Sequence, residues 1–515
     1  MPRFSEEQVK PAADDLMLAR LPKSDLGNAR RMIERFGDDI RFVPRQGWRA
    51  WNGVCWAIDD DGESKARIAA HATADAIDLE ADALKAKGPY EGEEAKDFNA
   101  RIAAHRKWGA DSGNAGKSRA MLDQAGALVR RDREDWDEDP YLLNVQNGTL
   151  HFKPSDNGVE AVLFPHNKQN YCTATARVAY DPEADCPLWR KHLEMCLPDI
   201  EKRAYFQRWC GYSLTGDISE QKFLIMQGQG ADGKSVTINA LAYMLGDYAM
   251  SVSIRSFLAN DYRSGSDASP DIARLAGPAR FVYVSEPKKG DKLDEAGVKS
   301  LTGGDRMTAR KLRQDIFEFF PIFKMIVPCN PKPIITSSDH GTWRRIQLLE
   351  WTNRIPEAVR DRNIDRKLQA EAAGILNWAI EGLGDWMADG LNPPDAVKDA
   401  VQRYRGQSDP MGDWLDERFD YGQTVDHKIP LSELYEDYAA WCEMNSFRPM
   451  ASRTFSAQLS DRQIVSVRPG GQTFKDQIQL KSGLQMMQTE ETREKSRGKE
   501  NIDAAAMEAG IELSD

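Results

Sequence analysis

A glycine-rich stretch that ends in a lysine and a serine has the composition of a phosphate-binding loop. Residues 228–235 read Gly-Gln-Gly-Ala-Asp-Gly-Lys-Ser. A hydrophobic run, Phe223–Met226, precedes the stretch, and a helical pattern follows it from Val236 to Leu245. Glycines in such a loop let backbone N–H groups turn toward phosphate oxygens, and the next helix points its positive N-terminus at them. The pattern therefore predicts nucleotide binding.

The reach of each side chain assigns roles within this loop. Lys234 is expected to contact the β- and γ-phosphates, and the Ser235 hydroxyl is expected to hold Mg²⁺. The other residues predicted to bind the nucleotide are Gly228, Gly230, Asp232, Gly233 and Val236.

A second string, 111–118, ends in the same Gly-Lys-Ser but has Asp111 where the first glycine belongs. The segment before it, Arg101–Trp108, is helical in pattern rather than strand-like. We therefore interpret this string as a break between two helices.

Two further apolar strands end in polar side chains. The run Arg280–Glu286 ends in a carboxylate, where such enzymes polarise the attacking water or bind Mg²⁺ through water. An ordinary buried strand with a surface glutamate is the alternative. The run Phe323–Asn330 ends in an amide that could sense the γ-phosphate from the side. No GTPase-type Asn-Lys-x-Asp motif is present, so ATP is the predicted nucleotide.

Two arginines, Arg344 and Arg345, come directly before the predicted strand Ile346–Trp351. An arginine in this position is what one subunit lends to the ATP site of its neighbour, where it stabilises charge on the transferring phosphoryl group. A surface ion pair is the alternative. If one of these arginines acts at the ATP site of a neighbouring subunit, the protein is predicted to form a ring-shaped oligomer.

Residues 299–315 carry five basic and two acidic residues in a chain whose net charge is −12. Arg310, Lys311 and Arg313 fall near the tip of a predicted hairpin, where they could contact DNA phosphates in the pore of a ring. A solvated basic loop is the alternative. The acidic total argues against a chain that coats nucleic acid indiscriminately, so DNA contacts must come from such local patches.

The elements that must position these residues form an α/β pattern from Ile218 to Trp351. Before this core we expect a hairpin around Asn52-Gly53, charged and exposed helices over Glu63–Lys107, and an acidic linker over Asp132–Asp139. The strands expected next are Leu142–Phe152 and Tyr171–Tyr180, and the helices are 187–197, 200–214 and, after the core, 361–390 and 396–404.

The C-terminal part has the order of a winged helix. Helices are expected near 409–419, 430–444 and 452–460, followed by a hairpin of Ile464–Val467 and Phe474–Leu480. Residues 452–462 are the candidate recognition helix. The polar last thirty or so residues lack aromatics and are predicted to be disordered.

The length of the chain and its cysteine content limit the number of domains and the kinds of metal or disulfide site to expect. A chain of 515 residues predicts three or four domains. Its seven cysteines include no C-x-x-C pair, so neither zinc nor a disulfide framework is expected. No secretory leader and no apolar run of membrane-spanning length is apparent, so we expect no membrane partner and a cytoplasmic location.

The order of these motifs resembles the superfamily 3 helicases, and within them the phage and plasmid primase-helicases that include the poxvirus primase-helicase. The resemblance runs from about Leu142 to Leu480. The pieces that carry it are Asn144–Leu150, Ala179–Pro182, Gly211–Asp217, the loop 228–235, Ser285–Pro287, Leu301–Asp305, Asn330 and Trp343–Arg345.

The resemblance implies a hexameric, ATP-driven ring that moves on DNA. It implies an AAA+ type P-loop core with a parallel sheet, preceded by a mixed α+β region and followed by a winged helix. The implied domains are an N-terminal module (1–135), a helper region (140–215), the ATPase core (216–395), the winged helix (405–482) and the tail (483–515).

By the same resemblance Lys234 and Ser235 take Walker A roles, Glu286 takes the Walker B role and Asn330 the sensor role. Arg345 is a better finger candidate than Arg344, and Lys311 and Arg313 fall where the family's pore hairpin contacts single-stranded DNA.

Two departures from the family's pattern qualify the resemblance. Ser285 stands before Glu286 where many members have paired acids, so Mg²⁺ must depend on Ser235, Glu286 and water. The acidic runs Asp59–Asp61 and Asp135–Asp139 lie in loop-like sequence, so primase activity is not expected of this chain.

The function expected from the sequence is a replicative DNA helicase of a phage, prophage or related mobile element, acting in a bacterial host. A primase or polymerase of the same replicon is the expected partner. The alternative is an origin-binding initiator or loader in which ATP drives assembly, and a third option is a DNA-independent ATPase or scaffold.

Overall fold

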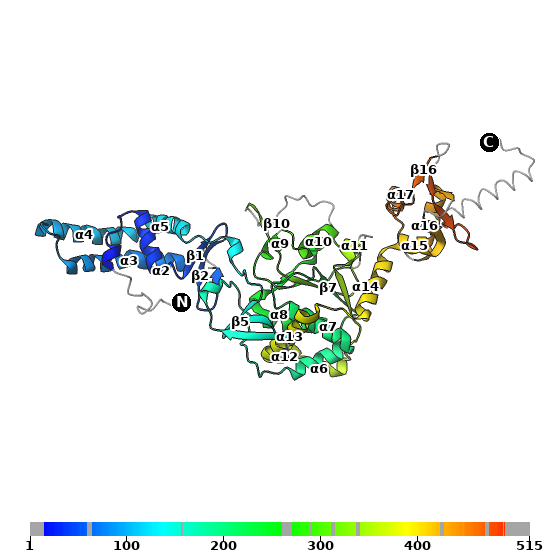
Figure 1. Ribbon diagram of the computed structural model, residues 1–515, viewed down its shortest axis with the longest axis horizontal. Coiled ribbons are helices and arrows are strands. Elements are labelled where there is room, and N and C mark those ends of the chain that lie inside the picture. Colours follow the sequence, from blue (N-terminus) through cyan, green and yellow to red (C-terminus); the bar gives the residue numbers. More distant parts are fainter. Residues whose placement is uncertain are drawn as a thin grey trace, which may run out of the picture. The chain divides into compact units, whose positions relative to one another are not determined.

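The computed structural model describes residues 15–58, 64–155, 158–259, 270–288, 290–310, 315–335, 340–422, 427–445, 447–468, 473–487 and 489. The chain divides into two compact units. One takes Met1–Lys332 and Arg345–Val397, and the other takes Pro333–Arg344 and Lys398–Asp515. Figure 1 labels many of their helices and strands.

The first unit begins with helices and a small antiparallel sheet. Pairing of Trp51 with Trp56 confirms the predicted hairpin around Asn52-Gly53. One helix ends at Ser112 and the next begins at Ala115, which confirms the predicted break. The elements are α1 (Asp15–Leu18), α2 (Asp25–Phe36), β1 (Ile40–Val43), β2 (Gly47–Trp51), β3 (Trp56–Ile58), α3 (Ser64–Lys87), α4 (Ala95–Ser112) and α5 (Ala115–Leu128).

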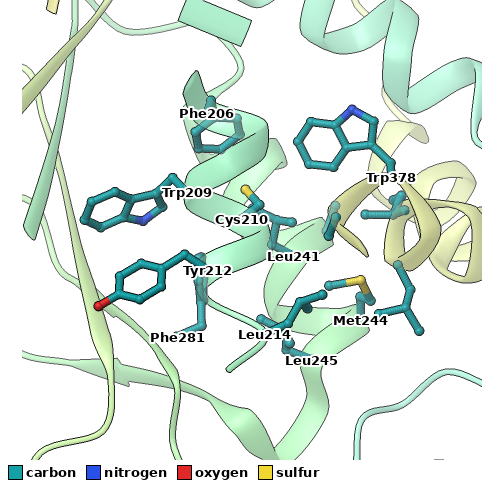
Figure 2. Packing of buried hydrophobic residues seen from close by; sticks show 14 of the residues in the cluster. Phe206, Trp209, Cys210, Tyr212, Leu214, Leu241, Met244, Leu245, Phe281 and Trp378 are labelled. Atoms are coloured by element: carbon teal, nitrogen blue, oxygen red, sulfur yellow. The ribbon is translucent and has the colours of Figure 1, made fainter. Parts of the chain in front are cut away.

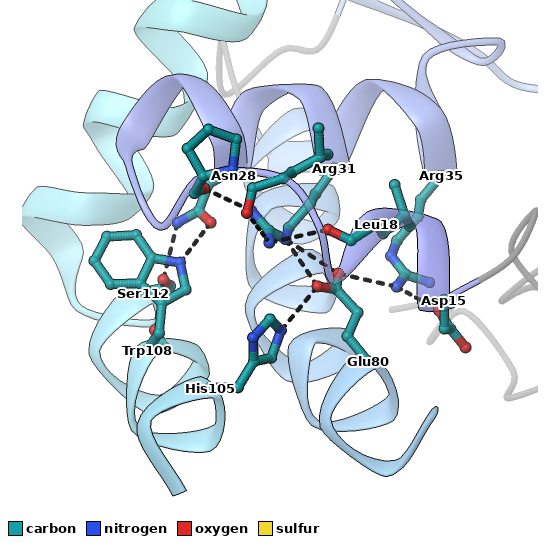
Figure 3. Close-up of polar contacts among 11 residues, drawn as sticks. Asp15, Leu18, Asn28, Arg31, Arg35, Glu80, His105, Trp108 and Ser112 are labelled. Carbon is teal, nitrogen blue, oxygen red and sulfur yellow. Dashed lines mark hydrogen bonds and ion pairs between the residues drawn. The ribbon is translucent and has the colours of Figure 1, made fainter. Parts of the chain in front are cut away.

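A buried ion-pair network joins α2, α3 and α4 (Figure 3). Arg31 and Glu80 are both fully buried, and their Nε and Oε2 atoms lie 2.9 Å apart. His105 Nε2 lies 3.1 Å from the same carboxylate. Burial opposes the charge on Glu80, but hydrogen bonds from His105 and Arg31 hold the pKa of that carboxyl below its usual value. The network fixes how these helices pack, because a buried charge needs its partners. The prediction that the helices over Glu63–Lys107 are exposed is therefore wrong for the face that carries Glu80 and His105, which are buried.

A three-stranded antiparallel sheet and two helices follow: β4 (Leu142–Val145), β5 (Gly148–Ser155), β6 (Gly158–Phe164), α6 (Pro187–Cys196) and α7 (Ile200–Tyr212), with short 3₁₀ turns at Arg133–Asp135 and Lys168–Asn170. The strand predicted over Tyr171–Tyr180 is wrong. The backbone N–H groups of Thr173 and Thr175 donate to the carboxylates of Asp137 and Asp247 instead of to a neighbouring strand. The acidic linker is therefore part of the packed structure.

A five-stranded parallel sheet, in the order β13-β7-β12-β9-β8, forms the centre of the first unit and confirms the predicted α/β core. Its strands are β7 (Phe223–Gly228), β8 (Ala249–Val252), β9 (Phe281–Val284), β12 (Lys324–Cys329) and β13 (Ile346–Trp351). Its helices and turns are α8 (Lys234–Leu245), 3₁₀ turns at Gly246–Tyr248, Ile254–Phe257 and Glu357–Val359, α9 (Pro270–Arg274), α10 (Glu295–Thr302), α12 (Ile364–Ala370) and α13 (Ala372–Asp389). A separate antiparallel pair, β10 (Met307–Arg310) and β11 (Ile316–Phe319), forms the predicted hairpin.

Helices α7, α8 and α13 pack into one hydrophobic core with the sheet (Figure 2). Helices α7 and α13 approach closely because glycines face each other. A Cβ atom on Gly211 would lie 2.1 Å from the Leu383 backbone nitrogen, and one on Gly382 would lie 2.2 Å from the Gln207 carbonyl oxygen. The pair therefore tolerates no side chain at these positions.

The second unit holds α11 (His340–Trp343), most of α14 (Asp395–Ser408) and a small α+β fold. That fold consists of α15 (Pro410–Arg418), β14 (Phe419–Tyr421), β15 (Lys428–Pro430), α16 (Leu431–Met444), α17 (Ser452–Asp461), β16 (Ser466–Val467), β17 (Phe474–Asp476) and β18 (Ile478–Leu480). One sheet has the order β15-β17-β16, and β14 pairs with β18.

The run Phe474–Leu480 is not the single strand that we predicted. Gln477 has φ 62°, and this left-handed residue divides the run between two sheets. Most of the tail predicted to be disordered, 488 and 490–515, lies outside the described residues.

Candidate nucleotide site

The candidate phosphate loop connects the carboxyl end of β7 to the start of α8. Gly230 and Gly233 have φ values of 85° and 84°, and Ala231 has φ 55°. A Cβ atom on Gly228 would lie 2.0 Å from Asp232 Oδ2 and 2.9 Å from the Trp351 carbonyl oxygen, so a larger residue would require the Asp232 side chain and β13 to shift. The turn therefore has the left-handed residues that a tight strand-to-helix loop requires.

A chain of polar contacts links three of the predicted site residues. Lys234 Nζ donates to Asn330 Oδ1 at 3.3 Å, and Asn330 Nδ2 donates to Glu286 Oε2 at 3.3 Å. Lys234 follows β7, Asn330 follows β12 and Glu286 lies just beyond β9. These strands are neighbours in the sheet, so their carboxyl ends meet at one edge.

The carboxylate of Asp232 fills part of the loop. It accepts hydrogen bonds from Lys234 Nζ, from the Gly230 backbone N–H at 3.1 Å and from the Lys234 backbone N–H at 3.3 Å. The indole Nε1 of Trp351 donates to the Asp232 carbonyl oxygen at 2.6 Å. Three donors of the loop that a phosphate could use are therefore engaged by the chain's own carboxylate.

The donor set near the loop suits Mg²⁺ as it is usually held in nucleotide sites. Magnesium takes one or two protein oxygens together with phosphate oxygens and water. Ser235, exposed in the first turn of α8, and the exposed Glu286 supply a hydroxyl and a carboxylate. Within the described part of the chain no group of three or more His, Cys, Asp or Glu residues could bind a metal alone.

Arg345 lies at the opposite end of β13 from the loop. Its carbonyl oxygen accepts from the Phe223 N–H at 2.9 Å, whereas Trp351, at the other end of β13, is paired with Gly228. Five residue steps of strand separate the two ends by about 16 Å. Arg345 is half-buried and Arg344 is exposed. The structure therefore does not place either arginine with Lys234.

The basic hairpin is present, but its tip is not described. Arg310 is the last residue of β10 and pairs with Ile316 of β11. Lys311 and Arg313 lie outside the described residues, as do Asp59–Asp61.

The sequence reasoning missed the helix behind the loop. His192 of α6 is buried, and its Nε2 lies 3.0 Å from Thr237 Oγ1 of α8. Burial lowers the pKa of His192 to about 4. A Cβ atom on Gly233 would lie only 2.3 Å from Cys196 Sγ, so α6 rests directly on the loop. Nothing in the spacing of 187–196 indicates this contact.

All seven cysteines are buried and none forms a disulfide. No helix in the described ranges is both long and apolar enough to cross a membrane.

The fold and the site define an α/β protein whose candidate site lies at the carboxyl edge of a parallel sheet. Two family models match this chain: "D5 N terminal like" over residues 29–198 and "Poxvirus D5 protein-like" over residues 406–479. Two segments of this chain are therefore similar to D5-type domains, in agreement with the resemblance to the phage and plasmid primase-helicases that include the poxvirus primase-helicase.

Curated relatives come from large DNA viruses. A "Putative helicase" of Acanthamoeba polyphaga mimivirus is 29% identical over 60% of this chain and 34% of that protein. A "Putative helicase" of Invertebrate iridescent virus 3 is 26% identical over 60% of this chain and 36% of that protein. A "Putative primase" of African swine fever virus is 22% identical over 64% and 36% respectively. The chain thus spans about a third of the length of these relatives.

Among solved structures, the apo structure of the NrS-1 C terminal region matches with 12% sequence identity and a TM-score of 0.34. The match covers 65% of this chain and 95% of that one.

Proposed function

We propose that this chain is an ATP-dependent DNA helicase that acts in genome replication. The observation that carries the proposal is the contact chain from Lys234 through Asn330 to Glu286, beside the glycine-rich loop. A γ-phosphate bound to Lys234 would lie near Asn330, which contacts Lys234, and near Glu286, which contacts Asn330. The names of the viral relatives support a helicase rather than another nucleotide hydrolase.

Each residue of this edge has a proposed part in hydrolysis. Lys234 stabilises negative charge on the β- and γ-phosphates, and Glu286 orients and polarises the attacking water. Asn330 holds the Glu286 carboxylate through its amide nitrogen. Ser235 and Glu286 would hold Mg²⁺, which neutralises charge on the phosphates when it is bound.

A ring is part of the proposal. Arg345 lies about 20 Å of extended chain away from the end of β13 that meets its own loop, by the rise of about 3.3 Å per residue. This position favours a role at the site of a neighbouring subunit, as an arginine finger. The strand order β13-β7-β12-β9-β8 supports an AAA+ type core, and we propose a hexamer by the family's expectation.

DNA contacts are proposed at two places. Arg310, Lys311 and Arg313 of the β10–β11 hairpin would contact single-stranded DNA phosphates in the pore. In the second unit, three helices and the strand order β15-β17-β16 support a winged helix, with α17 as the recognition helix.

The proposed winged helix also favours a second candidate function, an origin-binding initiator in which ATP drives assembly. Under both candidates we propose a phage, prophage or related mobile element in the cytoplasm of a bacterial host as the setting. A primase or polymerase of the same replicon remains the proposed partner.

A strand-displacement assay on a forked duplex tests the helicase proposal. We expect ATP-dependent unwinding by the full chain, loss of unwinding in Lys234→Ala and in Glu286→Gln, and retention when residues 405–515 are removed. Assembly on DNA that needs ATP but gives no unwinding would refute the helicase and favour the initiator. Hydrolysis unaffected by Lys234→Ala would refute the nucleotide site itself.

A further inference from the structure

The chain between two of the proposed catalytic residues belongs to the second unit. Asn330 follows β12 and Arg345 precedes β13, and both residues lie in the first unit. Most of the chain that connects them, Pro333–Arg344, is assigned to the second unit, together with α14 from Lys398 onward. The second unit therefore holds the connection between the proposed sensor and the proposed arginine finger.

One tyrosine of α14 holds this connecting segment at two places. The Tyr404 hydroxyl donates a hydrogen bond to the carbonyl oxygen of Pro333. The Tyr404 ring meets the Trp343 ring edge-on, with the ring centroids 5.4 Å apart and the planes at 85°. Pro333 is the first residue of the segment and Trp343 is the last but one, so a single side chain contacts both of its ends.

These contacts are buried. Tyr404 is 3% exposed and Trp343 is 4% exposed, and Pro333 is buried with them. Ala400 is also buried and lies four residues before Tyr404, so both residues are on the face of α14 that packs against protein. Because a buried hydroxyl that loses its acceptor is costly, Tyr404 favours one position of the segment.

Two prolines couple the position of Pro333 to that of Asn330. Residues 330–333 read Asn-Pro-Lys-Pro. Proline fixes its own φ and restricts the residue before it to extended conformations, so each of these four residues has little freedom. A displacement of Pro333 would therefore move Asn330. The Asn330 amide contacts Lys234 Nζ and Glu286 Oε2, each at 3.3 Å, so both contacts depend on where Pro333 lies.

The other end of the segment is close to Arg345. Trp343 lies two residues before Arg345, and the next residue, Ile346, begins β13. Extended chain advances at most about 3.6 Å per residue, so no more than about 7 Å of chain separates the two residues. The ring contact with Tyr404 thus limits where the backbone of Arg345 can lie.

We propose that Tyr404 is a positioning residue for ATP hydrolysis. It acts through Asn330 at the site of its own subunit and through Arg345 at the site of the neighbouring subunit. The inference rests on the proposed function and extends it to a residue of the second unit to which no role had been assigned. The second unit then controls the rate of hydrolysis through α14, whatever its small α+β fold binds.

Steady-state ATP hydrolysis by the full chain tests the inference. Tyr404→Phe removes the hydroxyl bond and keeps the ring, and kcat should fall about threefold to tenfold, the factor that one hydrogen bond contributes to an equilibrium. KM for ATP should stay within about twofold, because an interaction made only in the transition state lowers kcat and kcat/KM equally. Tyr435→Phe is the matched control. It removes a tyrosine hydroxyl bond to the Met450 carbonyl oxygen, 2.9 Å long, in the same unit, and should leave both constants unchanged.

A second variant tests the ring contact. Trp343→Phe keeps the hydroxyl bond but weakens the contact with Tyr404, and kcat should fall about twofold to tenfold with KM unchanged. Thermal unfolding shows which variants are folded. Unchanged kcat in the folded variants overturns the positioning role alone, as does an equal loss of kcat in Tyr404→Phe and Tyr435→Phe. Wild-type protein that hydrolyses no ATP, or whose hydrolysis survives Lys234→Ala, overturns the proposed function together with it.

Discussion

Replacing Asp232 with asparagine should strengthen nucleotide binding. The Asp232 carboxylate now accepts hydrogen bonds from Lys234 Nζ and from two backbone N–H groups of the loop. A bound triphosphate needs the same donors and brings negative charge to the same place. The nucleotide must therefore displace the carboxylate before it can bind.

The size of the effect follows from the contacts that are lost. Hydrogen bonds to charged groups contribute about 1.5–3 kcal/mol to stability. Two charges about 4 Å apart repel by about 4 kcal/mol at an effective dielectric constant of about 20. Because Asp232 can move away from the phosphates, the free-energy cost of displacing it is set by the lost hydrogen bonds, about 1.5–3 kcal/mol, and not by the full repulsion. We therefore expect ATP affinity to increase by about tenfold to a hundredfold in Asp232→Asn.

Equilibrium titration with ATP and Mg²⁺ measures this increase. Asp389→Asn, which removes an exposed carboxylate at the end of α13, controls for the change in net charge. An affinity for ATP that is unchanged or lower in Asp232→Asn would show that the carboxylate positions Lys234 for the phosphates instead of competing with them, and our reasoning would be refuted.

Three further predictions test other parts of the structure. Arg345→Ala should leave ATP affinity within about twofold but lower hydrolysis by about 10³, measured by phosphate release; an equal loss of binding contradicts a role at a neighbour's site. Gly211→Ala should destabilise the protein by about 3 kcal/mol in thermal unfolding, because Leu383 N would lie 2.1 Å from the new Cβ, whereas Gly116→Ala has open space and should be neutral or stabilising. Lowering the pH from 6.5 to 4 should cost about 3 kcal/mol of stability through His192, because its folded pKa of about 4 lies below its unfolded value of 6.5 and the unfolded chain binds the proton first. Denaturant titrations of His192→Gln should lack this component, and an identical pH profile in that variant would contradict it.

The sequence was sufficient to predict site residues whose type is dictated by the local backbone. The glycines of the loop could be located because positive φ values favour glycine. The polar residues just after buried strands could be located because the carboxyl ends of parallel strands share one edge of a sheet. The contact between Lys234, Asn330 and Glu286 agrees with that reasoning.

Contacts between distant segments could not be predicted in this way. The packing of α6 against the loop joins residues about forty positions apart and depends on how Cys196 meets Gly233. The segment Tyr171–Tyr180 has strand-like composition, but the N–H groups of Thr173 and Thr175 donate to side-chain carboxylates. Gln477 ends a strand by adopting a left-handed conformation that its residue type does not favour.

Strand β13 has a mechanical consequence for the proposed ring. One of its ends holds the loop through Trp351 and Asp232, and the other holds Arg345 through Phe223. The strand is paired with β7 along its whole length, and a close-packed interior transmits strain. A shift of Asp232 when nucleotide binds to one subunit would therefore move Arg345, which is proposed to act at the ATP site of the neighbouring subunit. Neighbouring sites would then hydrolyse ATP in sequence rather than independently.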